Sequence, residues 1–207
     1  MTTKHWDERY RGKDYLFGRE PNAFLRREAH RFEKGASVLA VADGEGRNGV
    51  FLAGLGLRVH SVDASSVALE KAERLAREAG VEIELEHADL SSWSWPQDAY
   101  DHVVAIFIQF ADPAMRTRLF EGMKRSVRPG GLVILQGYRP GQVDLGTGGP
   151  PRRDHMYTRD LLLAAFGDFD ILHLEEHDTV IREGSGHDGL SALIDLVARR
   201  PDPTNNS

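Results

Sequence analysis

Short apolar runs separated by polar turns recur along the chain, and each run rich in valine or isoleucine predicts a strand. Ser37–Ala42 and Tyr100–Ile108 are apolar over most of their length, as strands covered on both faces are. Glu82–His87 instead alternates polar and apolar residues, which is typical of an edge strand with one face in solvent. The other expected strands are Arg58–Asp63, Leu132–Gly137, Phe169–Glu176 and Leu190–Arg199.

Segments with apolar residues three and four positions apart alternate with these runs and predict helices. Ser65 is suited to cap the start of one helix and Gly80 to end it. Asp112 is expected to cap a second helix, with Pro113 in its first turn. The other expected helices are Pro21–Phe32, Asn48–Ala53 and Thr158–Phe166. Strands that alternate with helices indicate an α/β fold, with a mostly parallel sheet and helices on both faces.

A glycine turn at residues 43–46 follows the first strand and leads into the short helix Asn48–Ala53. Gly44 and Gly46 permit a positive φ and leave room for a ligand to approach the backbone. The second strand ends on the carboxylate of Asp63. Ligands of parallel sheets bind beyond the carboxyl ends of the strands, where this turn and Asp63 are both expected to lie. Because a carboxylate can accept hydrogen bonds from the two hydroxyls of a ribose, the pattern predicts a nucleoside ligand.

The same turn also permits a second interpretation, because Gly44-x-Gly46-x-x-Gly49 satisfies the glycine fingerprint of dinucleotide-binding proteins. An NAD(P)-binding oxidoreductase is therefore one alternative function. It is disfavoured because the chain has no room for a separate substrate domain and ends in a pair of strands. A non-catalytic protein that binds a cofactor is the other alternative.

The longer string VLAVADGEGRNGVFLA, followed by VHSVDAS, resembles the glycine loop of class I S-adenosylmethionine-dependent methyltransferases. The resemblance is to their small-molecule branch, the tellurite/thiopurine-methyltransferase-like proteins. Residues 15–25 are similar to the N-terminal signature of that branch, and the RPGG turn at residues 128–131 is similar to the turn before its fifth strand. The resemblance covers roughly Trp6–Pro201.

The resemblance implies a Rossmann-like sheet of seven strands, mostly parallel, with a C-terminal antiparallel strand joined as a hairpin. It implies transfer of a methyl group from S-adenosyl-L-methionine to a small-molecule acceptor. The chain departs from the family at Ala40, where an acidic residue is usual, and at Ala42-Asp43, where a glycine and a small residue are usual. We hypothesise that Asp43 takes over part of the missing acid's task of holding the methionine end of the cofactor.

Site residues follow from the resemblance. Asp89 is expected to meet the adenine amino group, with a turn cap before Ser91 as the alternative. The residues assigned to the cofactor are Ala42, Asp43, Gly44, Glu45, Gly46, Asn48, Asp63, Ala64, Ala88, Asp89, Leu90 and Ile106. Those assigned to the substrate are Tyr15, Phe17, Gln109, Tyr138, His155 and His187.

A catalytic base is needed only if the acceptor carries a proton that must be removed. The candidates are His187, His155 and Tyr157, and a packing or surface role is the alternative for each. His187 lies in the string EGSGHDG, which resembles one found in the small-molecule relatives. The Gly- and Pro-rich stretch Tyr138–His155 is expected to be a mobile flap beside the substrate.

The 207 residues are 41% hydrophobic and 28% charged, which suits one domain with a full core. We expect a single methyltransferase domain at residues 1–201. Its residues 1–35 would form an arm and helix that act as a lid over cofactor and substrate. Residues 202–207 are expected to be a disordered tail.

Charge and cysteine content exclude several classes of function. The net charge of −6 argues against nucleic-acid binding, which needs a basic surface. The chain has no cysteine, so it has no disulfide, thiol nucleophile or cysteine–zinc site, and no HExxH motif predicts a metal. No long apolar segment or signal peptide is evident, so we expect a cytoplasmic protein without membrane contact. The oligomeric state and the identity of the acceptor stay open.

Overall fold

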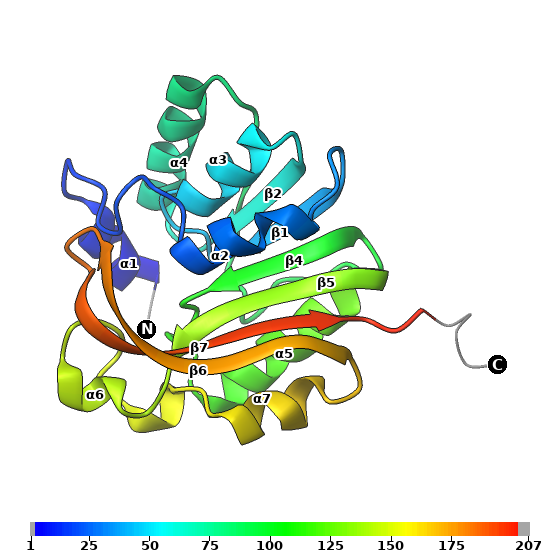
Figure 1. The fold of residues 1–207 in the computed structure, drawn as a ribbon. Helices are drawn as coiled ribbons and strands as arrows, with labels where there is room; N and C mark the ends of the chain where they lie inside the picture. Colours follow the sequence, from blue (N-terminus) through cyan, green and yellow to red (C-terminus); the bar gives the residue numbers. More distant parts are fainter. Residues whose placement is uncertain (1–2, 203–207) are drawn as a thin grey trace.

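All seven expected strands form, and they join one sheet in the order β3-β2-β1-β4-β5-β7-β6 (Figure 1). The computed structural model describes residues 3–202. Strands β1 to β5 pair in parallel, whereas β7 is antiparallel to both β5 and β6. The predicted fold class is therefore confirmed. The strands are β1 Ser37–Val41, β2 Arg58–Asp63, β3 Glu84–His87, β4 Tyr100–Ile106, β5 Val127–Tyr138, β6 Asp170–Glu183 and β7 His187–Arg199.

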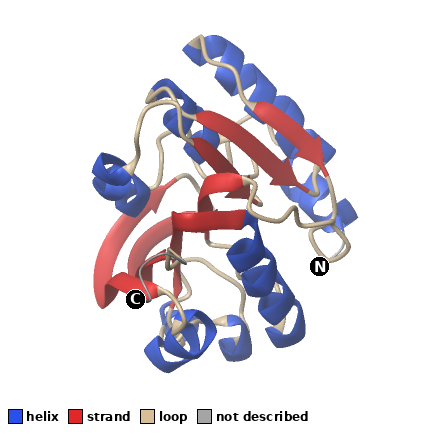
Figure 2. Cartoon of the chain, turned by 90° about the vertical axis from the view of Figure 1, so that its right-hand side faces the viewer, coloured by secondary structure: helices blue, strands red, loops and turns tan. Residues whose placement is uncertain are grey.

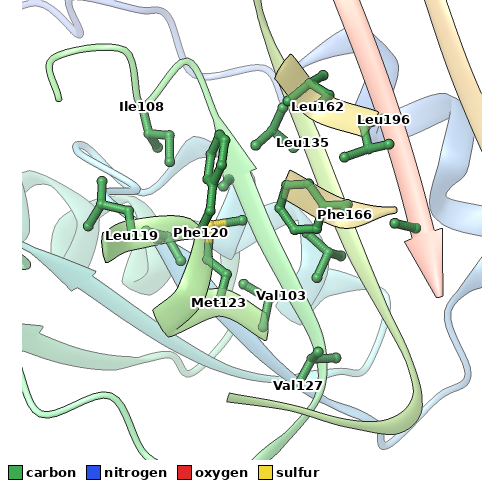
Figure 3. Packing of buried hydrophobic residues seen from close by; sticks show 14 of the residues in the cluster. Val103, Ile108, Leu119, Phe120, Met123, Val127, Leu135, Leu162, Phe166 and Leu196 are labelled. Carbon is green, nitrogen blue, oxygen red and sulfur yellow. The ribbon is translucent and has the colours of Figure 1, made fainter. Parts of the chain in front are cut away.

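Helices lie on both sides of the sheet (Figures 1 and 2). Alternate residues of the buried strands point to opposite faces, so Val38 and Val104 pack with α2 and α3, whereas Leu39 and Val103 pack with α5 and α7. Figure 3 shows the second of these cores. The helices are α1 Thr3–Tyr10, α2 Ala23–Glu28, α3 Arg47–Gly54, α4 Ser66–Ala79, α5 Pro113–Ser126, α6 Gln142–Leu145 and α7 Arg159–Phe166, with short 3-10 helices at Ala29–Arg31 and Arg153–His155.

Capping residues set the helix boundaries. The side chains of Ser65, Asp112 and Thr158 each accept a hydrogen bond from the backbone three residues ahead, as expected. The helix expected at Pro21–Phe32 instead begins after Asn22, whose side chain accepts from the amide of Leu25, and it ends six residues later. An asparagine side chain can accept from a free N–H in the first turn of a helix, so the helix begins after Asn22 and not at Pro21. Helix α1 was not expected, since its sequence is polar with only scattered aromatic residues.

The C-terminal hairpin is longer than its sequence suggested. The expected ends at Glu176 and Leu190 were wrong, because pairing continues until Glu183 lies opposite His187. Polar residues fill this extension because β6 is an edge strand with much of its surface in solvent. The hairpin turn is therefore only residues 184–186, and it starts with a left-handed glycine, Gly184.

The stretch expected to be an irregular flap is folded around one buried side chain. Gln142, at the start of α6, donates to Thr147 Oγ1 at 2.9 Å and to the carbonyl of Gly148 at 3.2 Å. Its Oε1 accepts from the amide of Ala192 in β7 at 2.9 Å. These bonds fix residues 146–149 against the hairpin.

Two expectations concern the chain ends and the membrane. Of the tail expected at residues 202–207, residues 203–207 lie outside the described residues. Within residues 3–202, no helix has the length and apolarity needed to cross a membrane.

Gly46 gives a test of how the glycine turn is packed. Its φ is +83°, and a Cβ there would lie 2.6 Å from the Cβ of Ala72 in α4. We expect Gly46→Ala to lower the free energy of unfolding by about 3 kcal/mol or more, through backbone strain and overpacking together. Gly80→Ala is the matched control, because Gly80 also has a positive φ but nothing lies near its missing Cβ. Gly80→Ala should lower the free energy of unfolding by only about 1 kcal/mol. Urea denaturation measures the free energy of unfolding of both variants. Equal losses in the two would contradict the close packing of Gly46 on Ala72.

Candidate active site

A cavity of about 1080 Å³ opens at the carboxyl ends of β1, β2 and β4. The sheet order reverses direction at β1, between β2 and β4, which is where open α/β sheets bind their ligands. Helix α1, residues 146–151 and the β6–β7 turn form the other walls. The cavity thus brings together segments from both ends of the chain.

The glycine turn is tied to the end of β2 through Asp63. The amide of Gly44 donates to Asp63 Oδ2 and the amide of Ser65 donates to Oδ1, both at 2.8 Å. Asp63 is buried in the cavity wall, and burial raises its pKa although the backbone donors oppose that rise. Each carboxylate oxygen has two lone pairs, so Asp63 retains capacity for a ligand's hydroxyls.

Asp43 also lines the cavity, and its carboxylate ties the glycine turn to the next helix and to the neighbouring strand. Its Oδ2 accepts from the amide of Gly49 at 3.0 Å and from Ser61 Oγ at 3.3 Å. Burial raises the pKa of Asp43 to about 7, against the effect of these two donors. A Cβ at Gly49 would lie 2.5 Å from Oδ2. Asp43 therefore joins β1, β2 and α3, and the hypothesis that it also holds the cofactor stays a prediction.

Asp89 caps a turn and also lies at the cavity, and its contact with adenine stays a prediction. Its Oδ1 accepts from the amide of Ser91 at 2.9 Å, so it does cap the turn, and this bond lowers its pKa. It also lines the cavity next to Leu90. A cap and a ligand contact are therefore compatible.

Most residues expected to bind a cofactor meet at the cavity, but three do not. Glu45 is buried in an ion pair with Lys71 of α4 at 2.7 Å, and Gly46 packs on Ala72. Ala88 packs against the core beside the sheet. The members that line the cavity are Ala42, Asp43, Gly44, Asn48, Asp63, Ala64, Asp89, Leu90 and Ile106.

The far end of the cavity is an aromatic chamber, formed by Phe17, Phe107, Tyr138 and His187. The His187 ring lies 4.4 Å from that of Phe107, 4.5 Å from Phe17 and 5.6 Å from Tyr138, measured between centroids. Tyr138 is 1% exposed, and its hydroxyl has no hydrogen-bond partner among residues 3–202. Gln109 also lines the cavity, although its amide is used to hold Tyr138 through the backbone.

A buried ion pair lies behind this chamber. Arg47 of α3 contacts Glu183 of β6 at 2.6 Å, and Asn22 Nδ2 donates to the other oxygen of Glu183 at 3.0 Å. Nδ1 of His187 lies 3.8 Å from Glu183. Burial would raise the pKa of Glu183, but His187 and Arg47 outweigh it and lower that pKa to about 2. Glu183 is therefore ionised at neutral pH.

Three residues expected at the substrate site lie outside the cavity wall. Tyr15 turns toward α4, where its hydroxyl donates to the carbonyl of Lys71 at 3.2 Å. His155 is buried with Nδ1 3.0 Å from the carbonyl of Gln109. Tyr157 is fully buried against Phe120 in the core. The structure therefore places none of these three side chains on the cavity wall, where the expected substrate contacts of Tyr15 and His155 and a base at His155 or Tyr157 would need them.

The N-terminal arm was expected over the site, but the helix α1 and the side chains that it places there were not predicted from the sequence. Tyr10 Oη would lie 2.8 Å from a Cβ at Gly44, so this ring covers the glycine turn. Trp6 stacks on Tyr10 at 5.8 Å, and Arg9 lies 4.9 Å from the Trp6 ring. The i, i+4 spacing of Trp6 and Tyr10 was the available signal. The loop 146–151 lies in the stretch that was expected beside the substrate, and the lining residues that were not predicted are His5, Leu16, Arg47, Ser91, Phe110, Met115, Ser185, Gly186 and Asp188.

One family model matches a little under half of the chain. Residues 38–131 match the model of a family described as "Methyltransferase domain". The match spans β1 to the start of β5, which includes the glycine turn, Asp63 and Asp89. The match supports the predicted resemblance, and the predicted methyl-transfer function and S-adenosylmethionine cofactor are confirmed, whereas the oxidoreductase alternative is not favoured.

Solved structures show that the likeness in fold extends over most of the chain. One, reported for the conversion of a disulfide bond into a thioacetal group during echinomycin biosynthesis, is 19% identical, with a TM-score of 0.79 over 98% of this chain and 93% of that one. TehB from Haemophilus influenzae is 17% identical, with a TM-score of 0.72 over 96% of this chain and 66% of TehB. Magnesium protoporphyrin IX methyltransferase from Synechocystis, solved with bound SAH, is 18% identical, with a TM-score of 0.65 over 86% and 79%. No curated protein matches the sequence.

The raised pKa of Asp43 predicts a pH dependence of stability for the methyltransferase domain. Its ordinary pKa is 3.8 and burial raises it to about 7, so the folded state binds a proton more tightly than the unfolded state. The stabilisation is complete below pH 4 and is lost as the pH rises through 7, by about 4 kcal/mol at most. Asp43→Asn keeps an acceptor for Gly49 but does not titrate, so its unfolding free energy should fall less between pH 4 and 8.

Urea denaturation at several pH values makes this measurement. Asp160→Asn, at an exposed position on α7, is the control and should follow the wild type. A parallel pH profile for Asp43→Asn and the wild type would show that Asp43 is not the cause.

Proposed function

We propose that the protein transfers the methyl group of S-adenosylmethionine to a small-molecule acceptor that binds in the same cavity. The observation that supports this most is the continuity of the cavity, which runs from the glycine turn and Asp63 to the aromatic chamber around His187. Its volume of about 1080 Å³ is at the upper end of the roughly 300–1,000 Å³ of ligand sites, so cofactor and acceptor can fit together.

The residues present fit the cofactor by their chemistry. Asp63 has free lone pairs for the two ribose hydroxyls, and Asp89 can accept from the adenine amino group. The absence of a side chain at Gly44 leaves a cradle between the turn and Tyr10. When bound, S-adenosylmethionine supplies an electrophilic methyl group on a sulfonium. The role of the protein is then to align the acceptor with this methyl group and to exclude water.

The N-terminal arm, residues 1–35, would serve as the lid of this site. Phe17 and α1 line the cavity, and Asp7 accepts from Ser65 Oγ at 2.6 Å, next to the carboxyl end of β2. The backbone amide of Phe17 also lies 3.5 Å from Glu45 Oε2 in the glycine turn. Contacts of this kind let the arm close on a bound cofactor. A single domain at residues 1–201, a cytoplasmic location and the lack of nucleic-acid partners are parts of the same proposal.

Calorimetry with S-adenosylhomocysteine, the demethylated product, tests the proposal. We expect saturable binding to the wild type and a loss of about tenfold to a hundredfold in Asp63→Asn, because an amide offers one acceptor oxygen in place of the two of a carboxylate. Asp170→Asn, at an exposed position of β6, should bind as the wild type does. Thermal unfolding of each variant checks that the glycine turn has kept its fold.

Three results would speak for other functions. Binding of NAD(H) without S-adenosylhomocysteine would favour the oxidoreductase. No binding of either would remove the enzymatic proposal. Cofactor affinity without turnover on a broad panel of acceptors would favour a non-catalytic binding protein.

A further inference from the structure

Strand β6 forms one free edge of the sheet, because β7 is its only strand neighbour (Figure 1). Along the outer side of an edge strand, backbone N–H and C=O groups have no strand partner and can pair with another chain. Proteins commonly block this by covering the edge or by placing charges along it. The two halves of β6 differ in how far they are blocked.

The first half of β6 is covered by the start of α7. The guanidinium of Arg159 donates to the carbonyl of Leu174 at 3.0 Å, and its backbone amide lies 3.3 Å from Glu176 Oε1. Glu175 and Glu176 are adjacent and both exposed. A second chain at this half of the strand would therefore meet a helix and, if it were another copy, carboxylates of like charge.

The second half of β6, at residues 178–182, exposes an apolar side chain. Val180 is 56% exposed, the highest value among the exposed large apolar residues of the described chain. Leu190, directly opposite it on β7, is 46% exposed. The two side chains lie next to each other on one face of the hairpin, because residues paired across two strands point to the same side.

Opposite charges flank Val180 on the same strand. Asp178 and Arg182 lie two residues before and after it, so the three side chains point to one face. Asp178 is contacted by Arg139 of its own chain, whereas Arg182 is exposed and has no ion-pair partner within residues 3–202. If two copies of this segment paired antiparallel with Val180 opposite Val180, each Asp178 would lie opposite the Arg182 of the other copy.

This register is the one in which the segment is complementary to itself. Centring the pair on Thr179 would place Val180 opposite Asp178, and centring it on Ile181 would place Val180 opposite Arg182. Both arrangements lose the apolar contact and the matched charges. A two-fold interface requires such self-complementarity, because the same surface is used on both copies.

We propose that residues 178–182 of β6 bind the same residues of a second copy of this chain, antiparallel about a two-fold axis at Val180. The two seven-stranded sheets then become one continuous sheet. On one of its faces, Val180 and Leu190 of both copies form an apolar row with an ion pair on either side. The inference concerns assembly and does not depend on the proposed function. The paired segment directly precedes Glu183, so the second copy would also hold the hairpin that carries His187.

Sedimentation velocity of the full-length protein, over about a hundredfold range of concentration, tests the inference. Because the paired segment is short, we expect a reversible dimer with a dissociation constant in the micromolar range. Amide hydrogen exchange locates the interface. Amides of residues 178–182 should exchange more slowly at high than at low protein concentration, whereas those of β3, the opposite edge of the sheet, should not change.

Variants test the register. Val180→Asp should weaken the dimer about tenfold or more, because two carboxylates would meet at the axis. Leu163→Asp, at an exposed position of α7, is the matched control and should leave the dimer intact. Arg182→Asp and Asp178→Arg each bring like charges together, so each should dimerise less than the wild type when studied alone. An equimolar mixture of these two variants restores opposite charges at both ends and should form a mixed dimer.

Several results overturn the inference. One is a protein that stays monomeric at the highest concentration. Others are a dimer that survives Val180→Asp, a dimer that protects β3 and not residues 178–182, and a mixture of the two charge variants that pairs no better than either alone. Thermal unfolding shows whether each variant folds. If Asp178→Arg does not fold because it loses its bond to Arg139, Val180→Asp and the exchange data decide.

Discussion

The buried ion pair between Arg47 and Glu183 joins the two ends of the chain at the active site. Arg47 opens the helix after the glycine turn, and Glu183 lies 136 residues later, at the tip of the C-terminal hairpin. Asn22 adds the N-terminal segment, because its side chain donates to Glu183 and its amide donates to Asn48 at 2.9 Å. A buried charge without its partner is strongly unfavourable. These contacts therefore fix the acceptor side of the cavity relative to the cofactor side.

The backbone around the cavity is strained at two strand ends. Ala42, after β1, has a φ of +50°, and Phe107, after β4, has a φ of +56°. Both residues line the cavity, and such conformations cost about 1–3 kcal/mol for a residue with a Cβ. They turn the chain sharply at the edge where the ligand binds. The remaining sheet, with buried apolar residues on both faces, supplies the stability that maintains them.

The two halves of the cavity differ in how they are built. On the cofactor side, backbone amides and carboxylates from adjacent strands are held by bonds within a short stretch of chain, as between Gly44 and Asp63. On the acceptor side, Phe17, Phe107 and His187 come from three distant segments and meet only through packing. The first side is therefore specified by local hydrogen bonds, whereas the aromatic chamber depends on the packing of the whole chain.

The sequence by itself determined the strands, the capped helices and the glycine turn with Asp63 at the next strand end. These features depend on local periodicity and on hydrogen bonds between near neighbours, which a short segment specifies. Only the tertiary structure decided that Tyr15, His155 and Tyr157 turn away from the cavity, and that α1 covers the turn with Tyr10. It also decided the length of the C-terminal hairpin, which carries His187 into the aromatic chamber. Aromatic side chains are suited both to a core and to a cavity wall, so residue type alone cannot tell which surface such a side chain will meet.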